Sequence, residues 1–352
     1  MSTVHHGTFV KKILEFFPVP KYLRMQAIGV SISDDAVRYV ELDDEGKGVY
    51  LKSFGKESIP IDTIEGGNIS KPEALLDALM KIQKRTGARY AIISLPEEKA
   101  YLFKTEIPVS SEDDVRQNIE FKIEENVPIS ADDAVFDFSF IPTSKPSSDG
   151  VVPVAVSLVP KDVVESYVAI FESAGMRPVA FHVESHAVAM SVVPKDDMRT
   201  YLVVTIDKTK SCLSVVSDGV VRYASTVSIG SIDLVSKGLG GFKTSKDESR
   251  SFLANDFKSE IKKVYTYWSS QGDNSAPLKH AKARNIEKVL VCGDGVFEAG
   301  VLEQIASGVP TSVEVANVWT NAFSFGDYIP EIVAKDSIEY AGAVGLALDN
   351  LV

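Results

Sequence analysis

The sequence predicts an α/β fold of two similar lobes, with a small α+β module inserted into the first lobe. Two observations carry this prediction. The order strand–strand–strand–helix–strand occurs twice along the chain, and a segment with a different order separates the two copies. The length of 352 residues agrees, because a single hydrophobic core rarely serves so long a chain. Folds of this kind bind ligands between their lobes, so the turns that face such a cleft are the first candidates for a site.

The first copy ends where Pro96 interrupts an apolar run. Its expected elements are strands at 26–31, 36–42 and 48–54, a helix at 71–86 and a strand at 89–95. Ser70, Pro72 and Glu73 predict the helix start, since serine caps a helix, proline fits its first turn and an acid faces its positive end. The run at 89–95 is apolar throughout, which is typical of a buried strand.

The inserted module has its own pattern. Its expected elements are a strand at 100–107, a helix at 111–126, strands at 134–141 and 152–158, and a helix at 161–174. On the first of these helices Val115, Ile119, Ile123 and Val127 lie four residues apart and predict one buried stripe. The polar run TSKPSSDG at 143–150 predicts a hairpin tip.

The second copy repeats the order of the first. Its expected elements are strands at 200–206, 212–217 and 220–228, a helix near 231–238, a long helix at 247–269 and a strand at 288–292. The two cysteines, Cys212 and Cys292, fall within predicted core strands. We interpret them as small buried hydrophobic residues of a protein from a reducing compartment, and not as disulfide partners.

The charge balance argues against two classes of partner. Lys and Arg total 37 and Asp and Glu total 49, so the net charge is −12. A general nucleic-acid binder needs a basic face, so none is expected. Adsorption of the whole body to anionic lipid is likewise disfavoured, although a local basic patch could still bind lipid. No apolar run reaches 18 residues, and hence no transmembrane helix is predicted.

The N-terminal segment, residues 1–21, is expected to be amphipathic. Phe9, Ile13 and Phe16 recur at helical spacing, with Lys11 between them. Two interpretations remain open: a tail that packs on its own domain, or a weak contact with a membrane surface or a partner.

Three turns are candidates for a cleft site. Ser31–Asp35 and Thr205–Ser211 occupy equivalent places in the two copies, and Gly293–Gly295 follows a strand and is expected to open a helix near Val296. Glycine lets a ligand approach the backbone closely, and the N–H groups at a helix start favour anions. The alternative is that these are ordinary polar turns.

Two further groups carry chemistry-bearing side chains. His182, Glu184 and His186 are close in sequence, but two ligands without a clear third make a poor metal site, and no metal is expected. Glu260 and Lys263 lie one turn apart on the long helix, where a solvated ion pair is the alternative to a ligand contact.

Seven segments, in this order, resemble motifs of the PilM family of type IV pilus assembly proteins, within the actin-like ATPase superfamily. They are IGVSISDDAVRYVEL (28–42), similar to the first phosphate loop; the inserted subdomain at 95–138; the segment at 159–189 that returns to the first domain; the second phosphate loop and hairpin at 203–234; EIKKVYTYW (260–268); KVLVCGDGVFEAGV (288–301), similar to the adenosine loop; and YAGAVGLAL (340–348), similar to the closing helix. The resemblance runs from about Phe16 to Leu348.

The resemblance implies an actin-like, ribonuclease H-like fold of two lobes with ATP or ADP and Mg²⁺ in the cleft. It implies these divisions: an amphipathic segment at 1–21, a first lobe at 22–97, an inserted subdomain at 98–178, more of the first lobe at 179–198, a second lobe at 199–334 and a C-terminal helix at 335–352. It further implies a cytoplasmic scaffold at the inner membrane, which binds the N-terminal cytoplasmic peptide of a bitopic, PilN-like pilus protein and contacts other pilus assembly components. The family's groove for that peptide lies between the first lobe and the inserted subdomain.

The first phosphate loop departs from the family pattern. The family aspartate falls on Ser31 and its glycine on Ser33, while Asp34 and Asp35 replace serines. The family aspartate holds the hydrated Mg²⁺ of ATP, and the glycine lets phosphate reach backbone N–H groups. A carboxylate beside a phosphate would repel it by about 1 kcal/mol or more.

The second loop departs in the same way. Thr205 stands in place of the family aspartate and Asp207 in place of its glycine. Lys208, Lys210 and Arg38 would offset part of the added negative charge. Three alternatives follow: ATP or ADP binding with weak hydrolysis at most, a scaffold that binds no nucleotide, and competent hydrolysis, for which no catalytic residue is identified.

The resemblance assigns nucleotide contacts to nineteen residues. They are Ser31, Ile32, Ser33, Asp34, Asp35, Arg38, Thr205, Asp207, Lys208, Thr209, Lys210, Ser211, Gly230, Glu260, Lys263, Gly293, Asp294, Gly295 and Phe297. Two other functions are alternatives to the pilus scaffold. An FtsA-like division protein would carry a C-terminal amphipathic helix, and the sequence ends at Val352 directly after the closing helix. A sugar kinase would need a catalytic aspartate near the second loop, where Thr205 stands.

Overall fold

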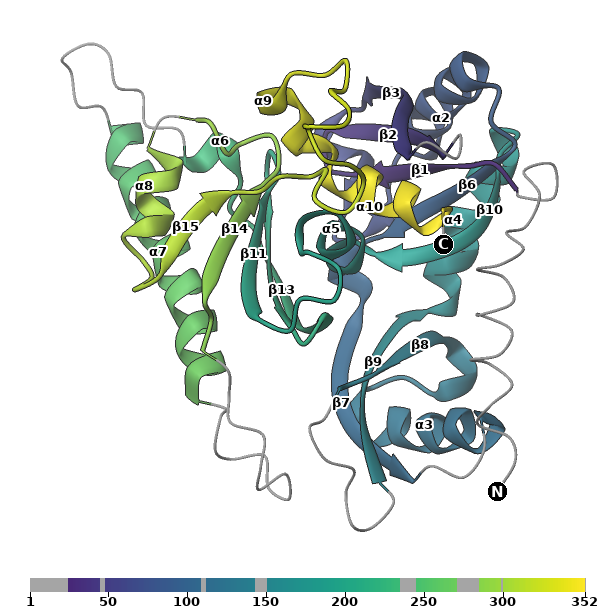
Figure 1. Cartoon of the computed structure of the whole chain (residues 1–352), viewed down its shortest axis with the longest axis horizontal. Coiled ribbons are helices and arrows are strands. Elements are labelled where there is room, and N and C mark those ends of the chain that lie inside the picture. Colours follow the sequence, from purple (N-terminus) through teal and green to yellow (C-terminus); the bar gives the residue numbers. More distant parts are fainter. Residues whose placement is uncertain are drawn as a thin grey trace.

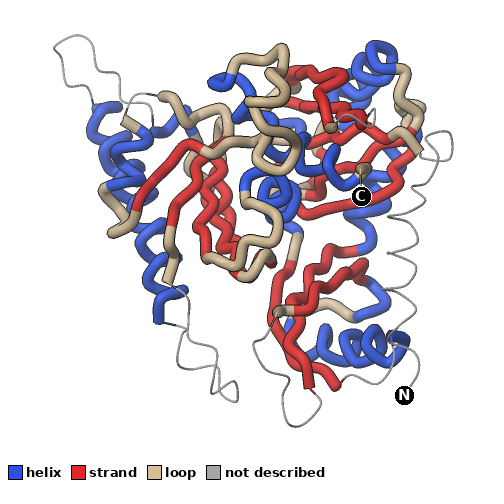
Figure 2. The backbone as a smooth tube through the Cα atoms, viewed as in Figure 1, coloured by secondary structure: helices blue, strands red, loops and turns tan. Residues whose placement is uncertain are grey.

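The computed structural model describes residues 25–44, 48–108, 112–142, 151–234, 245–270, 285–298 and 300–351. The predictions for residues 1–21, for the hairpin tip at 143–150 and for the end of the helix at 231–238 lie outside these ranges. Two five-stranded sheets and a three-stranded sheet form the framework, and helices cover them (Figure 1, Figure 2).

The first lobe is built on a sheet of order β10-β6-β1-β2-β3. Its strands are β1 (Ala27–Ile32), β2 (Ala36–Asp44), β3 (Val49–Ser58), β6 (Tyr90–Leu95) and β10 (Arg177–Val183). The first three are antiparallel neighbours, and β6 and β10 run parallel to β1. Helices α2 (Pro72–Thr86) and α4 (Lys161–Ser173) bury their apolar residues against one face. Helices α5 (Glu184–Val192) and α10 (Ala341–Asp349) lie on the other face.

The second lobe repeats this arrangement in the order β13-β12-β11-β14-β15. Its strands are β11 (Thr200–Ile206), β12 (Ser211–Ser217), β13 (Val220–Val227), β14 (Lys288–Cys292) and β15 (Ser312–Val315). Again three antiparallel strands are followed by two that run parallel to the first. The helices beside this sheet are α6 (Ser231–Leu234), α7 (Ser245–Ser270) and α8 (Val301–Ala306). The predicted duplication is therefore confirmed at the level of strand order.

One hydrophobic cluster joins the two lobes. It includes Val40 of the first sheet, Val203 of the second, and Val188 and Val344 from the two helices between them. Because α10 comes from the end of the chain, packing of the C-terminal residues completes the contact between the lobes. The contact between the lobes therefore has an apolar base.

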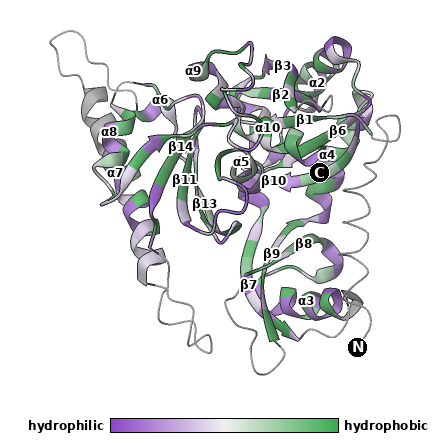
Figure 3. Ribbon diagram, in the orientation of Figure 1, coloured by the Kyte–Doolittle hydropathy of each residue, from purple (hydrophilic) through white to green (hydrophobic). Residues whose placement is uncertain are grey.

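The inserted module is a three-stranded antiparallel sheet with one helix. It comprises β7 (Tyr101–Pro108), α3 (Glu112–Asn126), β8 (Ala134–Phe140) and β9 (Val151–Pro160), in the sheet order β7-β9-β8. Val115, Ile119 and Ile123 are buried against the sheet and Val127 packs at the edge, so the predicted stripe is confirmed. The opposite face of α3 is hydrophilic in large part (Figure 3). The module also contacts the second lobe, because β7 and β9 lie against β13.

Short elements surround the cleft. They are η2 (Ile61–Thr63), β4 (Ile64–Glu65), β5 (Asn68–Ile69), η3 (Glu97–Lys99), α9 (Ala334–Ser337) and η5 (Ile338–Tyr340). A further short element, η4 (Ala131–Asp133), lies in the inserted module next to α3. The predicted helix near Val296 is wrong: residues 293–298 form turns, and α8 begins at Val301. The left-handed conformation of Gly293, with φ of 101°, and of Gly300 leads the chain through turns before a helix can start. Among the described helices, none combines the length and the apolar character needed to cross a membrane.

Candidate functional site

Two polar turns from different lobes meet across the cleft. The turn between β1 and β2 is closed by a bond from Ser33 N–H to the Ala36 carbonyl, and the turn between β11 and β12 by one from Asp207 N–H to the Lys210 carbonyl, each 2.9 Å long. Both therefore present their middle residues to the opposite lobe.

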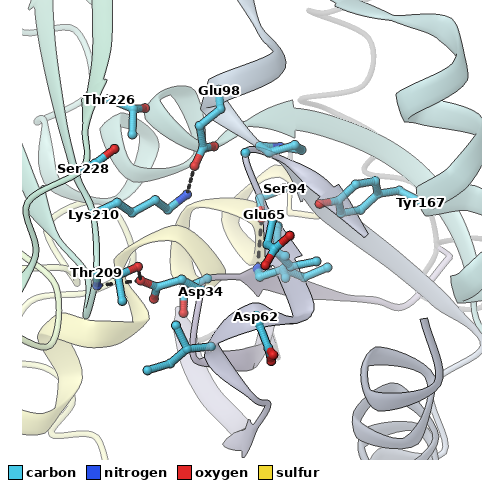
Figure 4. Close-up of a pocket in the computed structure, with 16 residues that line it drawn as sticks. Asp34, Asp62, Glu65, Ser94, Glu98, Tyr167, Thr209, Lys210, Thr226 and Ser228 are labelled. Atoms are coloured by element: carbon cyan, nitrogen blue, oxygen red, sulfur yellow. Dashed lines mark hydrogen bonds and ion pairs between the residues drawn. The ribbon is translucent and has the colours of Figure 1, made fainter. Parts of the chain in front are cut away.

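Asp34 and Asp35 link the first turn to the second. Asp34 Oδ2 accepts hydrogen bonds from the Thr209 N–H, at 2.6 Å, and from the Thr209 hydroxyl (Figure 4). Lys208 Nζ lies 3.4 Å from Asp35 Oδ2. We name these contacts the interlobe clasp. Asp34 is 5% exposed, so the clasp is formed largely out of water.

Arg38 holds the first turn from behind with a buried guanidinium group. Its Nη1 donates to Ser33 Oγ at 2.6 Å, its Nε donates to Glu339 Oε2 at 3.0 Å, and its Nη2 lies 3.4 Å from Asp35 Oδ1 and 3.5 Å from Asp294 Oδ2. Burial opposes the charge of Arg38, but the carboxylates outweigh it and raise the Arg38 pKa. Burial likewise favours the neutral form of Asp35, yet Arg38 and its other neighbours lower the Asp35 pKa. The guanidinium is thus committed to protein carboxylates.

A second ion pair also crosses the cleft. Lys210 Nζ, from the second lobe, lies 3.0 Å from Glu98 Oε1 (Figure 4). It also lies 3.2 Å from Glu184 Oε2, and both carboxylates come from the first-lobe side. Asp207 is buried beside them. Burial and then Glu184 raise the Asp207 pKa well above its usual value, so this carboxyl tends to keep its proton.

Several predicted contacts face protein neighbours. Thr205 Oγ1 lies 3.5 Å from Cys292 Sγ on the adjacent strand, and Ser211 Oγ donates to the Ile229 carbonyl at 2.7 Å. Ile32 N–H donates to Ser94 Oγ at 3.1 Å. Ser31 lies beneath α10, where a Cβ on Gly342 would come within 2.8 Å of its hydroxyl. These contacts lie within the protein and stabilise the two turns.

The three glycines of the predicted site are explained by packing between turns. A Cβ added to Gly230 would lie 2.3 Å from the Lys208 carbonyl oxygen, and one on Gly293 would lie 2.2 Å from that of Ile206. At Gly295 it would lie 2.3 Å from Ser231 Cβ. Neighbouring protein atoms occupy the space that a side chain would need at these positions. The glycines are therefore explained by packing within the protein, and a ligand is not needed to explain them.

Three predicted residues lie apart from the two turns that meet across the cleft. Glu260 and Lys263 form an ion pair with each other on α7, with 2.6 Å between Oε1 and Nζ, and the Lys263 side chain is 67% exposed. Phe297 is partly exposed, and Lys335 Nζ lies 5.4 Å from its ring centre. The structure brings together a smaller set: Ser33, Asp34, Asp35, Arg38, Lys208, Thr209 and Asp294, with Asp207 and Lys210 alongside.

A cavity of about 500 Å³ lies next to the clasp. The two turns form part of its wall, and the rest includes Glu65 beside the first sheet, Tyr167 on α4 and Thr226 on β13 (Figure 4). The sequence prediction missed these last three residues. Pro96 offers a signal that could have pointed to this region, because it ends a buried parallel strand and ligand sites in α/β folds gather at such ends.

The residues of the cleft do not fit MgATP. The Thr209 N–H, a donor that a phosphate would need, is taken by the Asp34 carboxylate. Arg38 is paired with the carboxylates of Asp35 and Glu339, so its positive charge is already balanced within the protein.

The two histidines considered as metal ligands have separate environments. His182 Nε2 lies 3.0 Å from Asp349 Oδ2, while Glu184 faces Lys210. His186 is buried, and burial followed by the nearby His182 lowers its pKa to about 4, so its ring is neutral at pH 7. The three side chains do not converge.

Comparison with known proteins identifies relatives of this architecture. The profile of the family described as "Type IV pilus assembly protein PilM" matches residues 29–351, which include both lobes and the inserted module. The structure of a PilM-PilN type IV pilus biogenesis complex aligns with a TM-score of 0.75 at 17% identity, and the alignment covers 94% of this chain and 99% of that chain. The predicted actin-like fold is confirmed.

Two other solved structures align at lower scores. MreB 5 of Spiroplasma citri, bound to AMPPNP, has a TM-score of 0.46 at 12% identity, with 92% of this chain and 95% of that chain covered. The cytoplasmic domain of EpsL, an inner-membrane component of the type II secretion system of Vibrio cholerae, has a TM-score of 0.44 at 9% identity, with 92% and 93% covered. Scores at this level support no inference about function.

Proposed function

The chain belongs to the PilM family of type IV pilus assembly proteins, and we propose that it is a scaffold for the N-terminal cytoplasmic peptide of an inner-membrane, PilN-like protein. The family match across residues 29–351 carries this proposal, because it includes the inserted module as well as the lobes. The PilM-PilN complex supports it, since nearly all of both chains align. The partner would hold the protein at the cytoplasmic face of the inner membrane.

The inserted module is the proposed place of contact. Three of its apolar side chains are exposed: Phe121 on α3 at 75%, and Val135 and Phe140 on β8 at 45% and 53%. Large exposed apolar side chains on a small module are typical of a protein-binding surface. Val135 and Phe140 lie on opposite faces of β8, so Phe121, the most exposed of the three, is the proposed anchor.

Calorimetry with a synthetic N-terminal peptide of the PilN-like protein from the same organism tests this proposal. We expect saturable binding, and we expect Phe121→Ser to weaken it about tenfold, because a lost apolar anchor costs roughly 1–2 kcal/mol. Ile329→Ser is the matched control, since Ile329 is 78% exposed and lies far along the chain from the module. No binding by the unaltered protein, or equal loss in both variants, would contradict the proposal.

For the cleft we propose that protein contacts stand in place of nucleotide. The Asp34 carboxylate on the Thr209 N–H is the observation that carries this, because one donor cannot serve both a carboxylate and a phosphate. ATP or ADP binding with Mg²⁺ and weak hydrolysis at most is the alternative that the family resemblance favours.

Titration with MgATP separates these two proposals. We expect no saturable heat at millimolar MgATP, and peptide binding that is unchanged by its presence. A measurable dissociation constant would contradict the nucleotide-independent cleft and leave the scaffold proposal intact.

A further inference from the structure

The cavity beside the interlobe clasp contains hydrogen-bonding groups that the protein leaves unsatisfied. Asp34 lines the cavity and is only 5% exposed. Its Oδ1 atom has no hydrogen-bond partner among the described residues. Thr226 lines the opposite, second-lobe side, and its buried Oγ1 is also without a partner there. Buried polar atoms are nearly always bonded, so two unpaired atoms on residues that line one cavity are compatible with a ligand that supplies donors.

The cavity wall is also strongly negative. Four carboxylates line it, from Asp34, Asp62, Glu65 and Glu98, against the single cation Lys210. Lys210 is already balanced by Glu98 and by Glu184, which lies outside the wall.

The rim of the cavity adds to this charge. Asp62 is paired with Lys71, whereas Glu65 accepts a hydrogen bond from the Ser70 hydroxyl at 3.2 Å and has no ion-pair partner among the described residues. An anionic ligand would be repelled by the carboxylates of the cavity wall, including those at its rim. A cation would be attracted by them.

The spacing of these groups disfavours a bare metal ion. No cluster of three His, Cys, Asp or Glu side chains within the described ranges is tight enough to coordinate one. The carboxylates are instead distributed over a cavity of about 500 Å³, a size typical of sites for small organic molecules.

We propose that this cavity binds a small organic cation with ammonium or guanidinium groups. An ammonium offers three donors and a guanidinium five, which suits acceptors at Asp34 and Thr226 with a carboxylate at Glu65. The ligand would touch both lobes, because Asp34 belongs to the first and Thr226 to the second. Its occupancy would therefore strengthen the closed arrangement.

Calorimetry and thermal unfolding with putrescine and agmatine test the proposal. We expect saturable binding of at least one of them and a rise in the unfolding temperature that saturates with it. Butane-1,4-diol controls for chain length without charge, and sodium chloride controls for ionic strength. Heat no greater than that of these two controls overturns the proposal.

Two variants locate the binding site. Thr226→Val removes an orphan hydroxyl at constant shape, and Glu65→Gln removes a rim charge, and each is expected to weaken the cation about three- to tenfold. Neither change touches the interlobe clasp. Glu172→Gln, an exposed carboxylate at the end of α4, is the matched control. Equal weakening in all three variants would indicate a general counterion effect and overturn the assignment.

A competition experiment identifies the source of the cation. If the site takes a free metabolite, putrescine binds equally with and without the PilN-like peptide. If it takes a basic side chain of a partner, a lysine-containing peptide displaces putrescine and its lysine-to-norleucine form does not. Both results support a cation site. The proposal is refuted if no cation binds in a way that the changes at Glu65 and Thr226 weaken.

Discussion

Asp34 presents to the Thr209 N–H the same kind of oxygen that a bound phosphate would present. The bond is short, at 2.6 Å, and the Thr209 hydroxyl donates to the same oxygen. Bonds from neutral donors to a carboxylate are among the stronger ones in proteins. The acid at this turn therefore binds the opposite lobe through the N–H group that a phosphate would otherwise use.

Asp34→Ala tests the strength of this contact. We expect a loss of about 2 kcal/mol in the free energy of unfolding, because a buried, charge-assisted pair of hydrogen bonds disappears. Hydrogen exchange of the Thr209 amide should become faster, since its acceptor is gone. Asp132→Ala, at an exposed carboxylate on η4, should change neither quantity. An unchanged Thr209 exchange rate would show that the clasp is not formed in solution.

Glu97 gives the cleft a dependence on pH. It is buried, it accepts a 2.9 Å hydrogen bond from the Ser185 N–H, and burial raises its pKa from 4.5 to about 7. The folded state therefore holds a proton that the unfolded state releases above pH 4.5. The stabilisation is complete below that value and is lost as the pH rises toward 7, by up to about 3 kcal/mol.

Glu97→Gln should remove that part of the pH dependence. Glutamine keeps an acceptor for Ser185 and cannot ionise, so the variant should equal the parent at pH 4.5 and exceed it in stability at pH 8. Urea unfolding at several pH values measures the difference. The same change at the exposed Glu172 should leave the pH profile as it is, and a parallel offset of the Glu97→Gln profile at all pH values would refute the assignment.

At the residue scale, the sequence predicted which residue types occupy the two turns better than it predicted what those residues contact. The acidic character of Asp34, Asp35 and Asp207 and its conflict with phosphate can be inferred from the aligned turns. The partner of each acid cannot, because Thr209 lies 175 residues from Asp34 and their meeting depends on how the lobes pack. Glu65, Tyr167 and Thr226 were missed for the same reason, since they converge only in three dimensions.

At the scale of elements, periodicity predicted most strands and helices within a few residues. The stripe of Val115, Ile119 and Ile123 was predicted because helical spacing alone decides which face is buried. The helix expected at Val296 was wrong because glycine pairs signal both phosphate loops and tight turns, and only the packing of Gly293 on Ile206 distinguishes them. The short strand β15 has too few residues for a clear pattern.

Two helices, α5 and α10, approach closely through small residues. A Cβ added to Gly345 would lie 1.7 Å from the Ala187 carbonyl oxygen, so alanine there requires the helices to separate. In an ordinary helix the same change would stabilise by about 1 kcal/mol. Here overpacking outweighs that gain, and we expect Gly345→Ala to destabilise the protein by about 2 kcal/mol net.

Thermal and urea unfolding of Gly345→Ala measure this cost. Gly326→Ala is the control, because its nearest atom would be Ser324 Oγ at an ordinary 3.5 Å. A Gly345→Ala variant as stable as the parent would mean that α5 and α10 are not packed as closely as described.

At the scale of the whole molecule, two kinds of contact hold the lobes together. They are the polar contacts across the cleft and the apolar cluster at its base. The apolar part follows from hydrophobic pattern and from the return of α10 to the first lobe. The polar part does not follow from local pattern, because it pairs residues of opposite lobes. The repeated strand order was therefore predictable, while the fit of one lobe to the other required the structure.

The bridge made by Lys210 should control that fit, because it places one cation among carboxylates from the other lobe. Its Nζ lies 3.0 Å from Glu98 and 3.2 Å from Glu184, and the buried Asp207 lies nearby. Lys210→Met keeps the length of the side chain and removes its charge, which leaves these acids to repel one another. Removing one partner of a buried ion pair costs about 3 kcal/mol or more, so we expect a loss of that order in the free energy of unfolding and a larger radius of gyration by small-angle X-ray scattering.

Adding Glu184→Gln to Lys210→Met should recover part of the loss, because it removes one uncompensated charge. If Lys210→Met is as stable and as compact as the parent, or if the second change gives no recovery, the lobes do not depend on this bridge and the apolar base alone holds them.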